Sequence, residues 1–222
     1  MSIASQIQQL RSSLPEGVRL LAISKYQPIE ALQEAYDAGQ RMFGENHIQE
    51  MAAKAAALPK DIEWHFTGHV QTNKIKYMAP FVSLIHAVDS FRLLREIDKH
   101  AAKHNRTIDC LLQIHIAQEE TKYGLTIDGC RQLLATEPWR ELHNVRITGL
   151  MAMGSNTDDM HQVRSEFRQM RQLFDELKAA YFADEPSFAQ LSEGMTDDYP
   201  IAIEEGSTIV RIGSMIFGSR GY

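Results

Sequence analysis

Short apolar segments alternate with segments of helical period along almost the whole chain of 222 residues. Most of the apolar segments contain β-branched residues, as the buried strands of a parallel sheet do. They fall at residues 19–24, 41–46, 62–68, 82–88, 108–116, 145–153, 188–192 and 207–213. Each is followed by a stretch in which we predict a helix. This alternation restricts the chain to α/β folds that are built around a parallel sheet.

The helical segments carry their own start signals. Pro28 stands in the first turn of a helix predicted over residues 28–39, a position at which proline is favourable. Ser90 and Thr126 are suited to cap the N-termini of two later helices. A further helix, with apolar residues spaced by three and four, is predicted over residues 3–14, ahead of the first strand.

The number of strand–helix units favours a closed barrel, because eight units complete a (β/α)8 barrel of the TIM type. No stretch rich in proline, glycine or serine interrupts them. We therefore predict the fold class α/β, with a single TIM-type barrel domain over residues 1–222 and an extra N-terminal helix. A doubly wound open sheet is the alternative.

The net charge and the cysteines exclude several classes of protein. The formal net charge of −6 argues against a nucleic-acid-binding face, and no stretch approaches the roughly 20 apolar residues of a membrane span. Cys110 and Cys130 have neither metal-ligand spacing nor a disulfide framework, which suits a reducing compartment. The N-terminus lacks the pattern of a signal peptide. We expect a cytoplasmic protein that binds neither nucleic acid nor membrane.

In a barrel of this kind the functional site lies at the C-terminal ends of the strands. The first predicted strand, within LLAISKYQP, ends in Ser24 and Lys25. A lysine that is partly desolvated at the barrel mouth is more easily kept neutral, and a neutral amine can condense with an aldehyde to form a Schiff base. The sequence thus predicts Lys25 as a Schiff-base residue, and the alternative is a solvated loop lysine.

The last predicted strand lies in GSTIVRIGSMIFG, residues 206–218, where Gly213 and Ser214 follow the strand at once. A glycine permits close approach, and the N–H groups at the start of a helical turn can bind phosphate. The loops after strands seven and eight are the usual phosphate site of this barrel. Ser192 and Thr196 can add hydroxyls from the strand-seven side. The alternative is a plain strand end punctuated by glycine.

Closure of the barrel would pair the last strand with the first and make Lys25 a neighbour of Gly213 and Ser214. An imine-forming lysine beside a phosphate cradle is what pyridoxal 5'-phosphate requires. Arg211 would then lie near the pyridine ring. Because a guanidinium cannot accept the ring's proton, it would leave the ring nitrogen unprotonated. We therefore predict pyridoxal 5'-phosphate as the cofactor.

Histidines near the strand ends allow a different class of function. His65 and His69 are four residues apart, and His86 and His115 lie near the ends of their own strands. Barrel hydrolases can bind a metal ion through histidine ligands at the C-terminal ends of the strands. No strand has two inward ligands in H-x-H spacing, however, so a metal-dependent hydrolase is the weaker hypothesis and we assign no metal ligands.

Six motifs run through the chain in the order SKYQP, FGENHIQE, WHFTGHVQTNK, GLMAM, LSEGMTDDYPIAI and GSTIVRIGSMIFGSR. Together they resemble the YggS/PROSC family of pyridoxal phosphate homeostasis proteins, and the similarity extends from about Leu20 to Arg220. Any one motif would be a weak signal, whereas six in the right order are a strong one. The family's fold resembles the barrel of the alanine racemase N-terminal domain, which agrees with the strand count.

The resemblance implies roles for individual residues. Lys25 matches the Schiff-base lysine of the family, and Asn46 matches an asparagine near the ring hydroxyl of the cofactor. Arg211 matches the partner of the pyridine nitrogen. The phosphate binders of the family match Ser192, Gly213 and Ser214.

Three positions depart from the family's pattern. His47 stands where tyrosine is common, Glu193 where methionine is common, and Thr196 where serine is common. Threonine keeps the hydroxyl, so phosphate binding is compatible with it. Glu193 would place an acid near a phosphate dianion only if it pointed inward, and we expect it to point out.

The resemblance implies a protein that holds and buffers pyridoxal phosphate and is not an enzyme. Racemisation needs an acid–base group on each face of the cofactor, and racemases take the second group from an added β-domain. We expect no such domain after the eighth strand, although His47, His65 or His86 could supply a base. The alternative is a weak amino-acid racemase or lyase that uses the same lysine. We expect a monomer whose transient partners are apo forms of enzymes that use pyridoxal phosphate.

Overall fold

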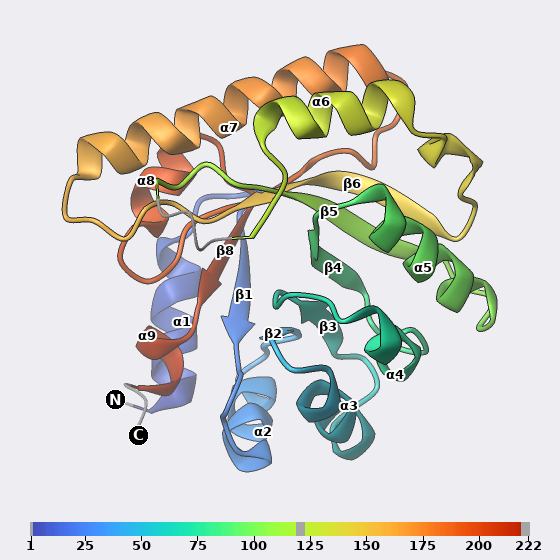
Figure 1. Cartoon of the computed structure of the whole chain (residues 1–222). Helices are drawn as coiled ribbons and strands as arrows, with labels where there is room; N and C mark the ends of the chain where they lie inside the picture. Colours follow the sequence, from blue (N-terminus) through green and yellow to red (C-terminus); the bar gives the residue numbers. More distant parts are fainter. Residues whose placement is uncertain (1, 119–122, 219–222) are drawn as a thin grey trace.

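The predicted strands form one closed parallel barrel in the computed structural model of the chain, which describes residues 2–118 and 123–218 (Figure 1). Neighbouring strands follow sequence order, and the barrel closes between the last strand and the first. The strands are β1 (Arg19–Ile23), β2 (Met42–Glu45), β3 (Glu63–Phe66), β4 (Leu84–Val88), β5 (Ile108–Ile114), β6 (Val145–Ala152), β7 (Gln190–Ser192) and β8 (Ile209–Ile212). The predicted (β/α)8 barrel is confirmed, and the open-sheet alternative is wrong.

Helices cover the outside of the barrel. Figure 1 shows α6 and α7 side by side along one flank, while α1 packs beside α9 at the seam where the barrel closes. The helices are α1 (Ile3–Ser13), α2 (Ile29–Asp37), α3 (Ile48–Ala57), α4 (Ile75–Met78), α5 (Phe91–Ala102), α6 (Ile127–Thr136), α7 (Met160–Tyr181), α8 (Tyr199–Glu204) and α9 (Ser214–Phe217), with 3-10 turns η1 (Thr72–Lys74) and η2 (Trp139–Glu141). Among the described residues, no helix combines the length and the apolar character that crossing a membrane would need.

Most helix starts follow the local sequence signals. The Ser90 hydroxyl accepts the N–H of Leu93, and the Thr126 hydroxyl accepts the N–H of Gly129, so both predicted caps are confirmed. The stretch that follows β3, in which we predict one helix, is instead η1 followed by one turn of α-helix. Its first residues include threonine and asparagine, which favour turns over helix interiors.

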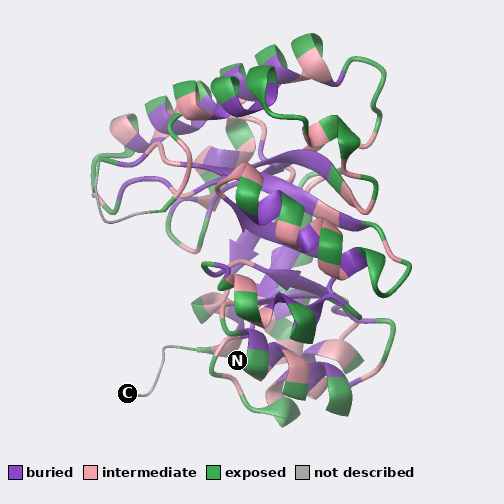
Figure 2. Ribbon diagram, turned by 45° about the vertical axis from the view of Figure 1, so that its right-hand side comes forward, coloured by how far each residue is buried: buried purple, intermediate pink, exposed green. Residues whose placement is uncertain are grey.

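Buried residues occupy two layers, the interior of the barrel and the shell between strands and helices. In Figure 2 the strands are buried along most of their length, and the helices are buried on their inward faces and exposed on their outward faces. The interior is partly polar, because His86 on β4 contacts Ser192 on β7, a strand that is not its neighbour. This polar contact links β4 to β7 inside the barrel, below the C-terminal strand ends that form its rim.

Candidate functional site

The C-terminal ends of β1 and β8 meet closely at the seam of the barrel. Leu21 pairs with Arg211 and Ala22 with Ile212. One step further, a Cβ built on Gly213 would lie 3.1 Å from the carbonyl oxygen of Ile23, a distance that leaves little room for any side chain. Since Lys25 comes two residues after Ile23, the predicted proximity of Lys25 to the start of α9 follows from this packing.

Lys25 is half-buried in the turn that follows β1. Ser24 before it is fully buried. Tyr26 after it has a φ of 65°, the left-handed conformation that residues with a side chain rarely adopt. The turn therefore has an unusual, fixed shape, and it presents Lys25 at the rim.

Two hydroxyls face each other across the loops that follow β7 and β8. The Oγ1 atom of Thr196 lies 3.0 Å from the Oγ atom of Ser214, which is the first residue of α9. The loop reaches this position through Gly194, whose φ is +86° and where a Cβ would lie 2.8 Å from the Cα of Tyr199. The N–H groups of Ile216 and Phe217 donate to the carbonyl oxygen of Gly213, so the N–H groups of Ser214 and Met215 are the ones at the start of α9 without an acceptor in the helix. The arrangement suits a small oxyanion such as a phosphate group.

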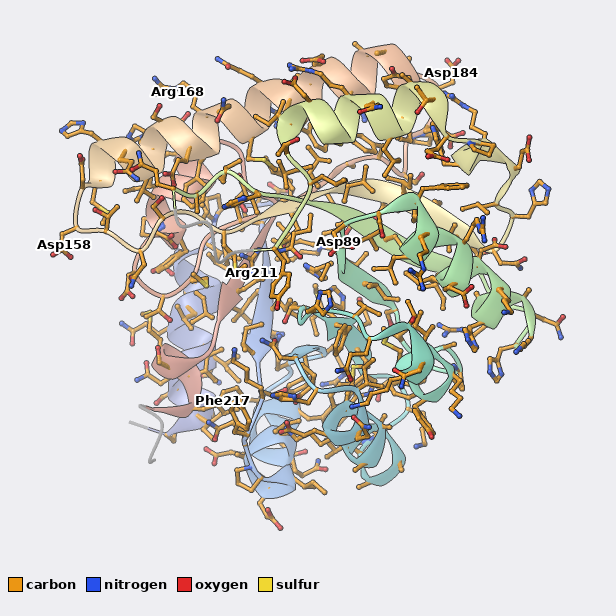
Figure 3. The ribbon with its side chains drawn as sticks, viewed as in Figure 1. Asp89, Asp158, Arg168, Asp184, Arg211 and Phe217 are labelled. Carbon is orange, nitrogen blue, oxygen red and sulfur yellow. The ribbon has the colours of Figure 1, made fainter. Side chains whose placement is uncertain are left out.

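Arg211 points its guanidinium into the barrel from β8 and is only 5% exposed. Its Nη1 donates to the carbonyl oxygen of Ser192 at 2.6 Å and to the Ser192 hydroxyl at 2.8 Å, and its Nη2 donates to the Ala152 carbonyl at 2.8 Å. In Figure 3 Arg211 lies among the strands, while Phe217 marks α9 at the periphery. Burial lowers the pKa of the Arg211 guanidinium to about 10, so it is still a cation and a donor at neutral pH.

A chain of hydrogen bonds continues from Arg211 across the barrel. The Ser192 hydroxyl lies 3.0 Å from Nδ1 of His86, and Nε2 of His86 lies 2.9 Å from Nδ1 of His65. Because Arg211 donates to the hydroxyl, the single hydroxyl proton is left for His86 Nδ1, and His86 in turn donates from Nε2 to His65. Burial lowers the pKa of His65 to about 3 and that of His86 well below its usual value. Both imidazoles are therefore neutral.

This chain changes the interpretation of three predicted residues. Ser192 is fully buried beneath the rim, so the hydroxyl that the structure places beside Ser214 is that of Thr196. The phosphate role of Ser192 stays a prediction. His65 and His86 bond to each other inside the barrel and do not stand at the rim as metal ligands. Among the residues that the structure describes, no group of three or more histidine, cysteine, aspartate or glutamate side chains could hold a metal ion.

Asn46 lies at the end of β2 beside a cavity. Its Oδ1 accepts the hydroxyl proton of Thr67 at 2.7 Å. The backbone of Gly68 packs so tightly on it that a Cβ there would lie 2.4 Å from the Asn46 carbonyl oxygen. The cavity, of about 460 Å³, is lined by Tyr26, Asn46, His47, Phe66, His69 and Lys74 among others. Asn46 and the turn that carries Lys25 thus border the same open space.

Glu193 lies on the face of the strand that points away from the barrel interior, as expected, but it is buried rather than exposed to solvent. It is 0% exposed, and among the described residues neither of its carboxylate oxygens has a hydrogen-bond partner. Its neighbour Ser192 faces the barrel interior, so the alternation of a strand directs Glu193 to the opposite face, beneath the outer helices. Burial raises the pKa of the Glu193 carboxyl well above its usual range, which keeps the group protonated and uncharged.

A buried ionic cluster at the foot of the Lys25 turn was not predicted. It consists of Glu45 at the end of β2 and Glu50 and Lys54 on α3. A signal was present in the sequence, because Lys54 falls three residues after the buried Met51, on the face of α3 that packs inward. A lysine on an apolar helix face needs a partner that only the fold supplies.

The family model for the alanine racemase N-terminal domain matches residues 1–221 of this chain. The pyridoxal phosphate homeostasis protein of Aquifex aeolicus is 43% identical over 92% of this chain and 88% of its own length. The protein of that name from Escherichia coli is 37% identical over 94% of this chain and 88% of its own length. The chain belongs to the pyridoxal phosphate homeostasis protein family.

Solved structures agree with this assignment to the pyridoxal phosphate homeostasis family. PipY of Synechococcus elongatus, solved without pyridoxal phosphate, superposes with a TM-score of 0.91 at 36% identity over 98% of this chain and all of PipY. PipY with pyridoxal phosphate bound superposes with a TM-score of 0.88. Alanine racemase from Bartonella henselae, at 14% identity, a TM-score of 0.71 and 58% of its own length covered, shares the fold alone.

Proposed function

We propose that this chain holds pyridoxal 5'-phosphate as a Schiff base on Lys25 and serves in the homeostasis of that cofactor, without robust catalysis of its own. The observation that carries the proposal is the meeting of three kinds of group at one seam. These are the half-buried Lys25 turn after β1, the facing hydroxyls of Thr196 and Ser214, and the buried guanidinium of Arg211.

The donors and their order along the seam fit the cofactor. When bound, pyridoxal phosphate supplies an aldehyde, whose carbon forms a C=N bond to the Lys25 amine while its oxygen leaves as water. Ser214, with Gly213 and Thr196, would bind the phosphate. Arg211 would donate to the pyridine nitrogen, and Asn46 would lie by the ring hydroxyl. Gly213 fits this account because its missing side chain lets the β8 end approach Ile23.

The interior histidines support a binding role. Catalysis at the α-carbon of an amino acid needs a proton-transferring group on the face opposite the lysine. His65 and His86 are buried, bonded to each other and neutral, which makes them poor candidates for moving protons at the rim. They instead hold Ser192 and, through it, Arg211.

A weak racemase or lyase activity is the second candidate, and one observation favours it. The phenolic oxygen of Tyr26 lies 2.8 Å from Nε2 of His47, next to the Lys25 turn, and such a pair can exchange a proton. Incubation of L-alanine with the protein and pyridoxal phosphate distinguishes the candidates. Sustained formation of D-alanine or of the keto acid would favour the enzyme, and its absence would favour the binding protein.

Absorbance spectroscopy tests the binding proposal. After addition of pyridoxal phosphate and removal of the excess, the protein should keep a yellow imine band that Lys25→Ala lacks. Lys74→Ala, which removes another lysine beside the cavity, is the control and should keep the band. A band of full strength in Lys25→Ala would contradict the proposal.

The remaining expectations concern the cellular compartment, the oligomeric state and the partners of the protein. We propose that it works in the cytoplasm as a monomer and delivers cofactor to apo enzymes through transient contacts. Cys110 and Cys130 are both buried and free, which suits a reducing compartment. Sedimentation analysis would test the monomer, and activation of an apo enzyme by the loaded protein, faster than free cofactor allows, would test delivery.

A further inference from the structure

Lys54 on α3 is a charged side chain placed almost completely out of water. Its side chain is 5% exposed, and its Nζ donates to Oε1 of Glu45 at 2.7 Å, to Oε1 of Glu50 at 2.7 Å and to the carbonyl oxygen of Ser24 at 2.8 Å. These three bonds use all the N–H groups of the ammonium. Burial of an ammonium is unfavourable unless it is fully paired, so the geometry of this cluster is tightly defined.

The cluster holds the backbone on both sides of Lys25. Lys54 binds the carbonyl of Ser24 directly, and the Ser24 hydroxyl donates to Oε1 of Glu45 at 2.7 Å. The Oε1 atom of Glu50, which Lys54 also contacts, accepts the N–H of Tyr26 at 2.6 Å. The residue before Lys25 and the residue after it are therefore fixed to one ammonium group, on a helix that packs beneath the turn.

The bond from Tyr26 to Glu50 maintains a conformation that the chain would otherwise leave. Tyr26 has a φ of 65°, which crowds its Cβ against the backbone. A charge-assisted hydrogen bond from its N–H to a carboxylate is among the stronger ones. Without it the turn could relax to an ordinary conformation, and the direction in which the Lys25 side chain leaves the backbone would change.

We propose that Glu50 and Lys54 are positioning residues for Lys25, and that they aim its amine at the place where the cofactor's aldehyde carbon lies. This inference rests on the proposed function. Formation of a C=N bond depends strongly on the approach of the amine to the carbonyl carbon, whereas phosphate binding at Thr196 and Ser214 does not. Loss of the cluster should therefore weaken binding of an aldehyde and leave binding of a phosphorylated alcohol unchanged.

Two ligands separate these contributions, pyridoxal 5'-phosphate and pyridoxine 5'-phosphate, which has an alcohol in place of the aldehyde. In Glu50→Ala we expect about tenfold weaker binding of pyridoxal phosphate, the effect of losing one hydrogen bond to a charged group, and unchanged binding of pyridoxine phosphate. Glu50→Gln keeps an oxygen that can accept the N–H of Tyr26 and should restore most of the affinity.

Asp98→Ala is the matched control for the loss of an acidic side chain. Asp98 on α5 accepts the backbone N–H of Asn144 at 2.6 Å, a contact like that of Glu50 with Tyr26, but ahead of β6 at the opposite end of the barrel. It should lower stability without changing either affinity. The double variant Lys54→Met/Glu45→Gln removes the ammonium without leaving a bare buried carboxylate, and it should behave like Glu50→Ala.

The outcomes distinguish the inference from the proposed function. If the unaltered protein forms no imine, the proposed function fails and the inference with it. If the imine forms and both Glu50→Ala and the double variant bind pyridoxal phosphate as tightly as the unaltered protein, the inference alone is overturned. An equal loss of affinity for both ligands would also overturn it, because that result indicates general damage to the site.

Discussion

Ser192 and Glu193 are adjacent residues that lie in opposite environments. Ser192 is bonded to Arg211 and His86 inside the barrel, while the carboxylate of Glu193 is buried on the other face and has no hydrogen-bond partner among the described residues. The alternation of a strand predicts that neighbours face opposite ways, but not that the outer face of this strand end is covered. That covering is a tertiary effect, and it is why the sequence predicted the outward direction of Glu193 but not its burial.

Glu193→Met should stabilise the protein, and increasingly so as the pH rises. Burial raises the pKa of Glu193 above its usual value of 4.5, so the unfolded state releases the proton first. As the pH rises from the pKa of Glu193 in the unfolded state to its pKa in the folded state, the free energy of unfolding of the unaltered protein falls by about 1.4 kcal/mol per pH unit. Removing a buried, unsatisfied group should gain about 1–3 kcal/mol at pH 8, with a smaller gain at pH 5.

Denaturant unfolding of the unaltered protein and of Glu193→Met, at pH 5 and at pH 8, measures the difference in their free energies of unfolding. The contributions of all other titrating groups cancel in that difference. Glu16→Gln, at an exposed position, is the control and should change stability little at either pH. A gain from Glu193→Met that does not depend on pH would argue against a titrating carboxyl in that position.

At the scale of elements, the pattern of apolar runs located every strand, and the rules of the barrel fold located the rim. The strand ends indicated Lys25, Arg211, Gly213 and Ser214 as site residues, and the family resemblance added Asn46. Because all strands of the barrel are parallel, these positions lie towards one end of it. The pairing of Thr196 with Ser214 across two loops was harder to predict than their common location. It depends on the path of the loop through Gly194, which local sequence does not specify.

The loops after β7 and β8 should respond specifically to the phosphate group. Ser214→Ala removes one of the two facing hydroxyls and should weaken binding of pyridoxal 5'-phosphate about tenfold, the effect of one hydrogen bond to a charged group. Binding of pyridoxal, which lacks the phosphate, should not change. Ser12→Ala, on the exposed face of α1, provides the control, and an equal effect of Ser214→Ala on both ligands would contradict a phosphate cradle.

At the scale of the whole molecule, the barrel is tied together through its interior. His86 and Ser192 are 106 residues apart in sequence, yet their contact joins β4 to β7 across the barrel. No periodicity in the sequence pairs residues at that separation, so the histidines were predicted to be near the strand ends but not to contact each other. Inside the barrel, His65 and His86 hydrogen-bond to each other, and His86 contacts Ser192, to which Arg211 donates. The two histidines therefore contribute to the fold and to the placement of Arg211.

The buried histidines should make the protein sensitive to acid. The pKa of His65 is lowered to about 3 in the folded protein from 6.5, so its contribution to stability is complete above about pH 6.5. It is lost as the pH falls from there towards 3, by about 1.4 kcal/mol per pH unit. His65→Gln, whose amide oxygen can still accept from His86, should show a shallower loss of unfolding free energy between pH 6.5 and 5. His161→Gln, at an exposed position, should keep the slope of the unaltered protein, and equal slopes for all three proteins would refute the prediction.

The central claim is that Lys25 forms the covalent bond to pyridoxal 5'-phosphate. Reduction of the loaded protein with borohydride converts an imine into a stable secondary amine, which mass spectrometry of the digested protein can assign to one residue. We predict that the added mass lies on Lys25, in a fraction close to one cofactor per chain. Modification spread over surface lysines, or located on another lysine of the rim, would contradict the account.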